Sequence, residues 1–362
     1  MNFRKIVKPA KKGIANILAR RPVNSSTEIR LTRLCTQRCR QCNIYNKSTE
    51  PPTVNPDDFA LMARRLRDYG AYVGFISGGE PTLVPHLNEM LHEAVKTFPV
   101  AVTLNTGLYN TTKTIEHIAE YVLRHNINIQ TSLDGLNDVG DDLRGVPEFS
   151  RTVLKHMEVI SEMRRDLRSH SLLYVNIVLN NLNMDQIPEM IHHIAAKGWD
   201  VTVGLYHTVT SSTKNDEALR PVLGQDLDRL IAYLIDHPRI LTLKPFLQGI
   251  KVFLDGNGFK KHCPFLTSPL LATRLTIMET GDVHLCRGEP IGNILKHELR
   301  EIFSDRAYTQ RLSEYRRCSG CWTSCYIQRS LLLHPRTPKE FLSNMKKVLR
   351  ARRAVRLKPE VQ

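Results

Sequence analysis

Six times in succession, a short apolar run rich in β-branched residues is followed by a longer segment of helical period. The short runs predict strands and the longer segments predict helices. Regular alternation of the two predicts a parallel sheet with helices outside it. Periodicity alone allows either an open doubly wound sheet or a barrel-like sheet. The predicted strands cover residues 27–34, 71–77, 100–105, 127–133, 172–179 and 201–206.

The helices between these strands begin and end at typical signals. Asn55 predicts an N-cap in front of Pro56, and Gly70 predicts the end of that helix. Further helices are predicted to begin near Leu83, Thr112, Pro147, Met184 and Leu227, and a capping box at Thr337–Glu340 opens a last one.

The alternation stops after about residue 207, where Gly, Pro and Cys-bearing turns with short strands take over. Such a shift in composition predicts a domain boundary. The 362 residues are enough for one large α/β domain and a smaller one. We predict a basic extension at 1–22, the α/β domain at 23–240, a small cysteine-bearing domain at 241–335 and a basic helix at 336–362.

The net charge of +15 is concentrated at the two ends of the chain. Seven Lys/Arg lie in residues 1–22 and seven in 346–358. When these fourteen charges and the negative charge of Glu360 are set aside, residues 23–345 carry a net charge of only about +2. No specific nucleic-acid binding is therefore expected. Helical period in both ends predicts either peripheral contact with anionic lipid or an acidic electron donor, or solvated helices packed on the body.

No apolar run approaches the length of about 18 residues that a membrane-spanning helix needs. The first residues also lack a continuous apolar segment of the secretory type. We therefore expect a cytoplasmic protein. In that compartment eight cysteines predict metal or catalytic ligands rather than disulfides.

Cys35, Cys39 and Cys42 follow the first predicted strand with C-x3-C-x2-C spacing. This is the edge at which a parallel α/β sheet presents its chemistry. Three thiolates leave one iron of a 4Fe-4S cluster without a protein ligand, whereas a structural zinc ion takes four ligands. Free thiols or part of a zinc site are the alternatives.

A second motif, Gly78-Gly79-Glu80-Pro81, comes directly after the second predicted strand. Paired glycines let the backbone approach a ligand closely, although a simple tight turn has the same pattern. The two motifs, on a β/α body over about 27–206, resemble the radical S-adenosylmethionine superfamily. Gln41 departs from this pattern, because many members have an aromatic residue there; the change affects shelter of the cluster, not its ligation.

The resemblance implies a partial (β/α)6 TIM-like barrel with a small C-terminal iron-sulfur domain. It also implies that S-adenosylmethionine binds the open iron of a 4Fe-4S cluster on Cys35, Cys39 and Cys42. The implied cofactor contacts are Gly78, Gly79 and Glu80 at the methionine amino end, Ser132 and Arg144 at the ribose and carboxylate, and Asn180 at the adenosyl part. For each residue, a turn or strand-end hydrogen bond is the alternative.

The other five cysteines form a second group: Cys263, Gly281-x4-Cys286 and Cys318-x2-Cys321-x3-Cys325. A four-thiolate zinc site is one interpretation. The resemblance instead indicates an auxiliary iron-sulfur domain of the SPASM/Twitch type with one auxiliary 4Fe-4S cluster. Because five cysteines exceed the four that one cluster needs, we expect Cys263, Cys286 and Cys325 as ligands, with Cys318 or Cys321 as the fourth.

The resemblance implies an oxidoreductase. Such an enzyme cleaves S-adenosylmethionine reductively to a 5′-deoxyadenosyl radical, which takes hydrogen from an unactivated C-H bond, with electrons from flavodoxin or ferredoxin. The cofactor supplies the difficult chemistry, and the protein supplies position and shelter. A fully ligated auxiliary cluster favours net oxidation of the substrate. The sequence identifies no acid or base.

Only 34 residues precede Cys35, which leaves no room for an N-terminal peptide-recognition domain. We therefore expect oxidation of an alkyl or alcohol carbon of a small biosynthetic metabolite. One concrete candidate is hydroxylation of a bacteriochlorophyllide (tetrapyrrole) methyl group, because the hydroxylase of that carbon is a similar-sized family member. The alternatives are a radical S-adenosylmethionine peptide maturase and, in another class, a metal-binding nucleic-acid adaptor.

Overall fold

The computed structural model describes residues 3–44, 52–208, 213–256, 262–270, 273–333 and 338–354. Six strands in these ranges run parallel in the order β6-β5-β4-β3-β2-β1 and form an open, partial barrel, which confirms the predicted parallel sheet. They are β1 (Asn24–Arg30), β2 (Val73–Ser77), β3 (Ala101–Asn105), β4 (Asn128–Ser132), β5 (Leu173–Leu179) and β6 (Asp200–Leu205).

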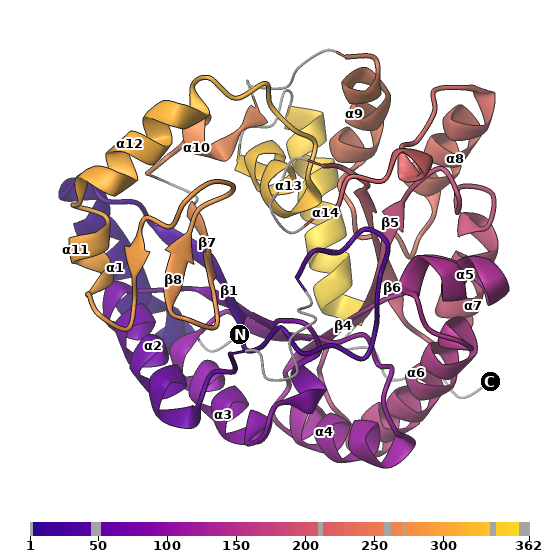
Figure 1. The fold of residues 1–362 in the computed structure, drawn as a ribbon, viewed down its shortest axis with the longest axis horizontal. Helices are drawn as coiled ribbons and strands as arrows, with labels where there is room; N and C mark the ends of the chain where they lie inside the picture. The colour runs from indigo at the N-terminus through magenta and orange to yellow at the C-terminus, as the bar shows by residue number, and fades with distance from the viewer. Residues whose placement is uncertain are drawn as a thin grey trace.

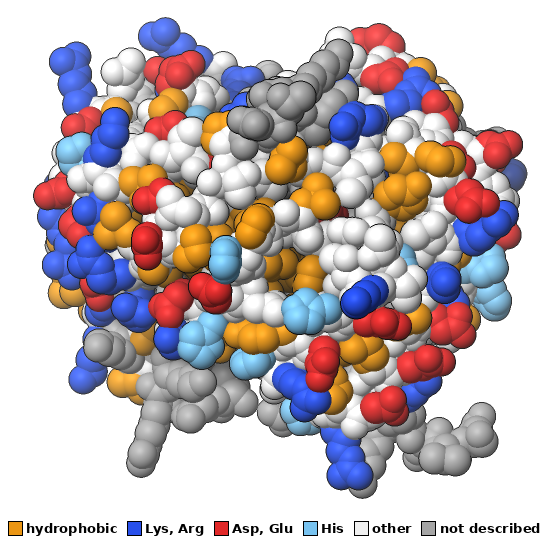
Figure 2. Space-filling view, turned by 60° about the horizontal axis from the view of Figure 1, so that its bottom comes forward, with side chains coloured by type: hydrophobic (Ala, Val, Ile, Leu, Met, Phe, Trp, Pro, Cys, Tyr) orange, Lys and Arg blue, Asp and Glu red, His pale blue; other side chains and the backbone are white. Residues whose placement is uncertain are grey.

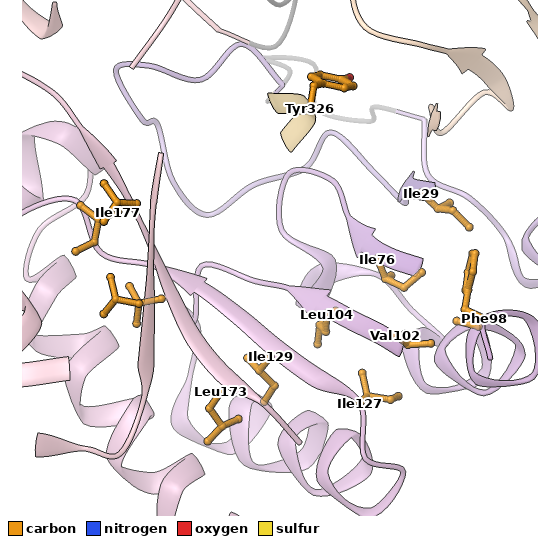
Figure 3. Close-up of a cluster of buried hydrophobic side chains, with 14 of the residues drawn as sticks. Ile29, Ile76, Phe98, Val102, Leu104, Ile127, Ile129, Leu173, Ile177 and Tyr326 are labelled. Atoms are coloured by element: carbon orange, nitrogen blue, oxygen red, sulfur yellow. The ribbon is translucent and has the colours of Figure 1, made fainter. Parts of the chain in front are cut away.

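Helices cover the outside of this sheet in an arc (Figure 1). They include α2 (Pro56–Tyr69), α3 (Leu87–Thr97), α4 (Thr112–Arg124), α6 (Phe149–Asp166), α7 (Ile187–Ala196) and α8 (Gln225–Asp236). Aliphatic side chains such as Ile29, Ile76 and Leu104 are buried in the layer between strands and helices (Figure 3). Burial of these side chains is the main force that holds the two layers together.

Several predicted helix starts are wrong by a few residues. The helix expected near Leu83 begins at Leu87, because residues 81–83 form a 3-10 turn and Pro85 disfavours helical backbone at Val84. The helix expected from Pro147 begins at Phe149, where Asp141 accepts both the Glu148 and Phe149 N–H groups. The helix expected near Met184 begins at Ile187. Helices α5 (Asn137–Arg144) and α9 (Lys244–Leu254) were not predicted.

The C-terminal part adds strands to the same sheet, which the sequence did not indicate. β7 (Thr273–Ile277) pairs with β1 in parallel, and β8 (Asp282–His284) and β9 (Gly292–Asn293) continue it in antiparallel. The helices of this part are α10 (Pro264–Thr267), α11 (Leu299–Ile302), α12 (Arg306–Tyr315), α13 (Ser324–Leu333) and α14 (Pro338–Ala354). Tyr326 on α13 lies on the other side of the sheet from the outer aliphatic layer (Figure 3).

Helix α14 begins at Pro338, as predicted, whereas Thr337 of the expected capping box lies outside the described residues. At the other end, α1 (Phe3–Leu18) packs on α2: Asn16 Nδ2 donates to Tyr69 O at 3.1 Å. Two apolar side chains of α1, Ile14 and Leu18, do not pack on the body, because they are 60% and 80% exposed. No helix in the described ranges has the length and apolar character needed to cross a membrane. Acidic and basic side chains are intermixed over the face in Figure 2.

Candidate active site

The loop after β1 carries the first three cysteines and is held from both sides. Arg38 N donates to Arg144 O and Arg40 N to Leu143 O, so the loop lies along the end of α5. Backbone N–H groups of Gln37 and Ile44 donate to the sulfurs of Cys35 and Cys42, each at 3.4 Å. Hydrogen bonds of this kind favour thiolates and leave their remaining lone pairs for iron.

Burial opposes the ionisation of two of these thiols in the absence of iron. It raises the pKa of Cys35 to about 12 and also raises the pKa of Cys39, although the Arg144 guanidinium opposes the second effect. Arg144 Nη1 lies 3.7 Å from Cys39 Sγ. A cation beside the sulfurs offsets part of the negative charge that three thiolates bring into a buried site.

Gly78 and Gly79 let the loop after β2 lie against the cysteine loop. Gly79 N donates to Thr32 O and Glu80 N to Leu34 O, both at 2.7 Å. A Cβ on Gly79 would stand only 2.0 Å from Leu34 O. The glycine pair is therefore required for close approach of two backbones, and both glycines line the cavity beside the cysteines.

Glu80 joins the ends of β2 and β3. Its carboxylate accepts from Thr106 Oγ1 and from Gly107 N, both at 2.7 Å, and from the Thr82 hydroxyl at 2.8 Å. Burial raises the pKa of this carboxyl group, and the hydrogen bonds oppose that rise. The Glu80 side chain thus organises the loops, while residues 78–80 line the cavity. Its predicted contact with the methionine amino end stays a proposal.

Asp134 is a buried anion that positions two cavity residues. Its Oδ2 forms an ion pair with Arg144 Nη2 and accepts from Gln41 Nε2 at 2.7 Å, and its Oδ1 accepts from Val178 N at 2.7 Å. Gln41, the departure from the family pattern, is therefore part of the cavity lining rather than a gap in it. The sequence contained the signal for Asp134, because the residue follows Ser132 at the end of β4.

The cavity of about 230 Å³ at this place fits a polar zwitterion such as S-adenosylmethionine bound to a cluster. Three of its polar atoms are buried and have no hydrogen-bond partner among the described residues: Gln41 Oε1, Asn105 Oδ1 and Arg144 Nε. Buried polar groups normally have partners, so these atoms indicate a ligand with both donors and acceptors. Asn105 was not among the predicted contacts.

The predicted cofactor contacts divide into two groups. Gly78, Gly79, Glu80, Ser132 and Arg144 all line this cavity, together with the three cysteines. Asn180 is not among the lining residues: its side chain donates to Val178 O and accepts from Leu182 N, both at 2.9 Å. These bonds form a turn, so the geometry favours the structural alternative for Asn180.

Four of the five C-terminal cysteines surround a second, apolar cavity. They are Cys263 at the start of α10, Cys286 after β8, and Cys318 and Cys321 between α12 and α13. Phe265, Leu266, Arg287, Tyr315 and Gly320 complete the lining. Burial raises the pKa of Cys263, Cys286 and Cys321. Trp322 packs beneath this loop, where its Nε1 donates to Phe246 O at 2.8 Å.

Cys325 does not join this set, which differs from the expected ligands. It is exposed, whereas the other four thiols are half-buried, and it is absent from the lining of the second cavity. The reason is helical geometry: Cys325 already belongs to α13, so its side chain leaves the loop in the direction that the helix sets. Both Cys318 and Cys321 line the cavity, whereas only one of the two was expected as a ligand.

Residues 29–194 match the family model of the Radical SAM superfamily, and residues 270–325 match that of SPASM, an iron-sulfur cluster-binding domain. The fold and the first cysteine site thus define a radical S-adenosylmethionine enzyme. The chain thus carries a radical SAM domain and a SPASM domain, so its cofactors are a 4Fe-4S cluster with S-adenosylmethionine and an auxiliary iron-sulfur cluster.

The chain is similar to two curated proteins of Bacillus subtilis (strain 168). It is 22% identical to sporulation killing factor maturation protein SkfB, over 81% of this chain and 68% of that protein. It is 27% identical to antilisterial bacteriocin subtilosin biosynthesis protein AlbA, over 85% of this chain and 68% of that protein. A probable GTP 3′,8-cyclase of Sulfurisphaera tokodaii is 23% identical over 65% of this chain and 79% of that protein.

Among solved structures, SuiB of Streptococcus suis bound to precursor peptide SuiA has a TM-score of 0.63 and 20% identity. The match covers 84% of this chain and 71% of that one. At this identity the likeness concerns the fold alone.

Proposed function

We propose that this protein is a peptide maturase that oxidatively modifies an unactivated C-H position of a precursor peptide. Two curated relatives are named for peptide products, a killing factor and a bacteriocin, and a structure with the same fold holds a precursor peptide. This reading takes the place of the expected small metabolite. No comparison supports a bacteriochlorophyllide substrate.

The observation that carries the oxidative part is the second cavity. With Cys263, Cys286, Cys318 and Cys321 around it, a cluster there has four protein thiolates and no iron open to substrate. Such a cluster supplies an acceptor for an electron, whereas an open iron would supply a binding site for substrate. We therefore infer net removal of electrons from the peptide.

The chain's own residues would prepare the first site. Cys35, Cys39 and Cys42 would hold a cluster whose reduced form, with S-adenosylmethionine, supplies hydrogen abstraction through a 5′-deoxyadenosyl radical. Arg144, held by Asp134, would neutralise the cofactor carboxylate, and Ser132 and Asn105 would bind hydroxyl or amino groups. Pre-positioned polar groups in a sheltered cavity spend no free energy on reorganisation.

The test is turnover of the anaerobically purified holoprotein with S-adenosylmethionine, a reductant and short peptides encoded beside its gene. We expect 5′-deoxyadenosine to form with one peptide, whose mass falls by two hydrogens: one abstracted, the other lost as a proton with its electron. Cys35→Ala is the matched negative control. Acceleration by a small metabolite and by no peptide would refute the proposal. Electron supply by flavodoxin or ferredoxin and membrane contact of the basic ends stay predictions.

A further inference from the structure

The inner face of the sheet at β1 and β7 carries more positive charge than its own carboxylate balances. Glu28 Oε2 accepts from Arg274 Nη2 at 2.9 Å, its Oε1 lies 3.4 Å from Arg30 Nε, and Ser77 Oγ donates to that oxygen at 2.8 Å. Both guanidiniums thus form ion pairs with the same carboxylate. Arg274 also lies over the Phe75 ring, 5.0 Å from its centre.

A third guanidinium reaches the same place from α13. Arg329 Nη1 donates to Ser25 Oγ at 2.7 Å, and Ser25 Oγ donates to the carbonyl of Thr273, the residue before Arg274. No carboxylate of the described residues forms an ion pair with Arg329. Burial, and then the neighbouring Arg274, lower its pKa to about 9, so Arg329 stays protonated at neutral pH without a compensating anion.

A buried hydroxyl adds to this surplus of donors. Ser26 is in register with Arg274 on the adjacent strand and is fully buried, and its Oγ has no partner among the described residues. A half-buried charge without a carboxylate partner and a fully buried hydroxyl without a hydrogen-bond partner are both costly. An anion at this position would relieve both costs.

The position is connected to the cofactor site and to solvent. Glu28 and Ser77, which hold Arg274 in place, are themselves lining residues of the S-adenosylmethionine cavity. On the other side, Cys325 in the first turn of α13 is exposed. A negative charge on its sulfur raises the pKa of Arg274, Arg329 and Tyr174, so Cys325 lies near all three side chains. A group bound here would lie between the exposed Cys325 and residues that line the S-adenosylmethionine cavity.

We propose that Arg274 and Arg329 form a subsite for a carboxylate of the substrate peptide, with Ser26 as a further donor and Cys325 at its entrance. The proposal rests on the function proposed above for the choice of a peptide over other anions. Guanidinium groups bind carboxylates through paired hydrogen bonds, and both arginines are already held on rigid elements. The subsite would fix an acidic side chain or the C-terminus of the peptide.

The thiol at the entrance provides a test that requires no turnover. In the cluster-loaded holoprotein, Cys325 should be alkylated while the cluster cysteines are protected. Anionic iodoacetate should react with Cys325 faster than neutral iodoacetamide does. The ratio of the two rates should be on the order of tenfold higher for Cys325 than for the thiol of free glutathione. Arg329→Gln should remove this preference and Arg329→Lys should keep most of it. Arg151→Gln, an exposed arginine on α6, is the matched control and should change nothing.

Competing anions then identify the ligand class. Two competitors are used: N-acetylglutamate amide carries a side-chain carboxylate, and N-acetylalanine carries a C-terminal one. Both should slow the alkylation of Cys325 by iodoacetate in the wild type but not in Arg329→Gln. The better competitor shows which carboxylate the subsite prefers. Protection by GTP alone would assign the site to a nucleotide and overturn the proposal. Protection of Cys325 by the clusters, or an unchanged ratio in Arg329→Gln, would overturn it too. Because no peptide turnover is measured, failure of the maturase function would leave these results intact.

Discussion

Replacing Gly79 by alanine tests whether the S-adenosylmethionine site depends on close contact between two loops. The added Cβ would stand 2.0 Å from Leu34 O and 2.7 Å from Leu34 C, and real Cβ atoms almost never come within 3.0 Å of such atoms. Since both atoms belong to the backbone, no side chain can rotate away. The two loops must separate by at least 1.0 Å (3.0 − 2.0).

That separation breaks two hydrogen bonds. The bonds from Gly79 N to Thr32 O and from Glu80 N to Leu34 O are 2.7 Å long, and 1.0 Å more takes both to about 3.7 Å, beyond hydrogen-bond range. At a net contribution of about 0.5–1.5 kcal/mol each, the loss is about 1–3 kcal/mol of folding free energy. Because the same loops line the cavity, we expect the affinity for S-adenosylmethionine to fall at least about tenfold, which corresponds to about 1.4 kcal/mol.

Isothermal titration calorimetry of the anaerobic holoprotein measures the affinity, and urea unfolding measures the stability. The control is Gly224→Ala, since Gly224 has extended backbone and a Cβ there would meet no heavy atom within 4 Å. Its affinity for S-adenosylmethionine should be unchanged. Wild-type affinity and stability in Gly79→Ala would show that the loops move freely, and that the steric reasoning is wrong.

Three further results are expected. Cys321→Ser should lower the iron content from about eight to about four per chain while Cys325→Ser keeps about eight; loss of iron in Cys325→Ser would restore that cysteine as a ligand. Although burial opposes it, Arg30 and Arg274 lower the pKa of Glu28 from 4.5 to about 2. The resulting stability of about 3 kcal/mol is fully present above pH 4.5 and is lost as the pH falls toward 2. Urea unfolding of Glu28→Gln should therefore show a flatter pH dependence between pH 5 and about 3 than the wild type, and equal slopes would contradict this. Deleting residues 1–20 should weaken sedimentation with anionic vesicles in low salt, since α1 exposes Ile14 and Leu18 beside basic residues; unchanged sedimentation would exclude membrane contact through α1.

The barrel and the first cysteine site were predictable because their signals are local in the chain. Each strand and its helix are neighbours in sequence, and Cys35, Cys39 and Cys42 lie within one loop. The same holds for Asn55 and Gly70, whose capping geometry matches the prediction: Asn55 Oδ1 accepts from Asp58 N at 2.8 Å, and Gly70 has φ of 100°.

The remaining features depend on three-dimensional packing that periodicity does not encode. Whether Cys318 or Cys325 faces the second cavity is decided by the residue at which α13 begins, and helix boundaries are poorly determined by sequence. The packing of α1 on α2 includes a hydrogen bond from Asn16 to Tyr69 O, which helical period does not reveal. The role of Asp134 depends on Arg144 and Gln41, which come from two other segments.

The pairing of β7 with β1 affects how the protein is made. Asn24 pairs with Thr273, so about 250 residues must be synthesised between the two partners. At a translation rate of roughly 5–20 residues per second, the outer edge of β1 stays unpaired for about 12 to 50 s before β7 has been synthesised. An unpaired edge invites pairing with other chains during that time. The edge of β1 is thus open to pairing with other chains until the C-terminal part of the protein emerges.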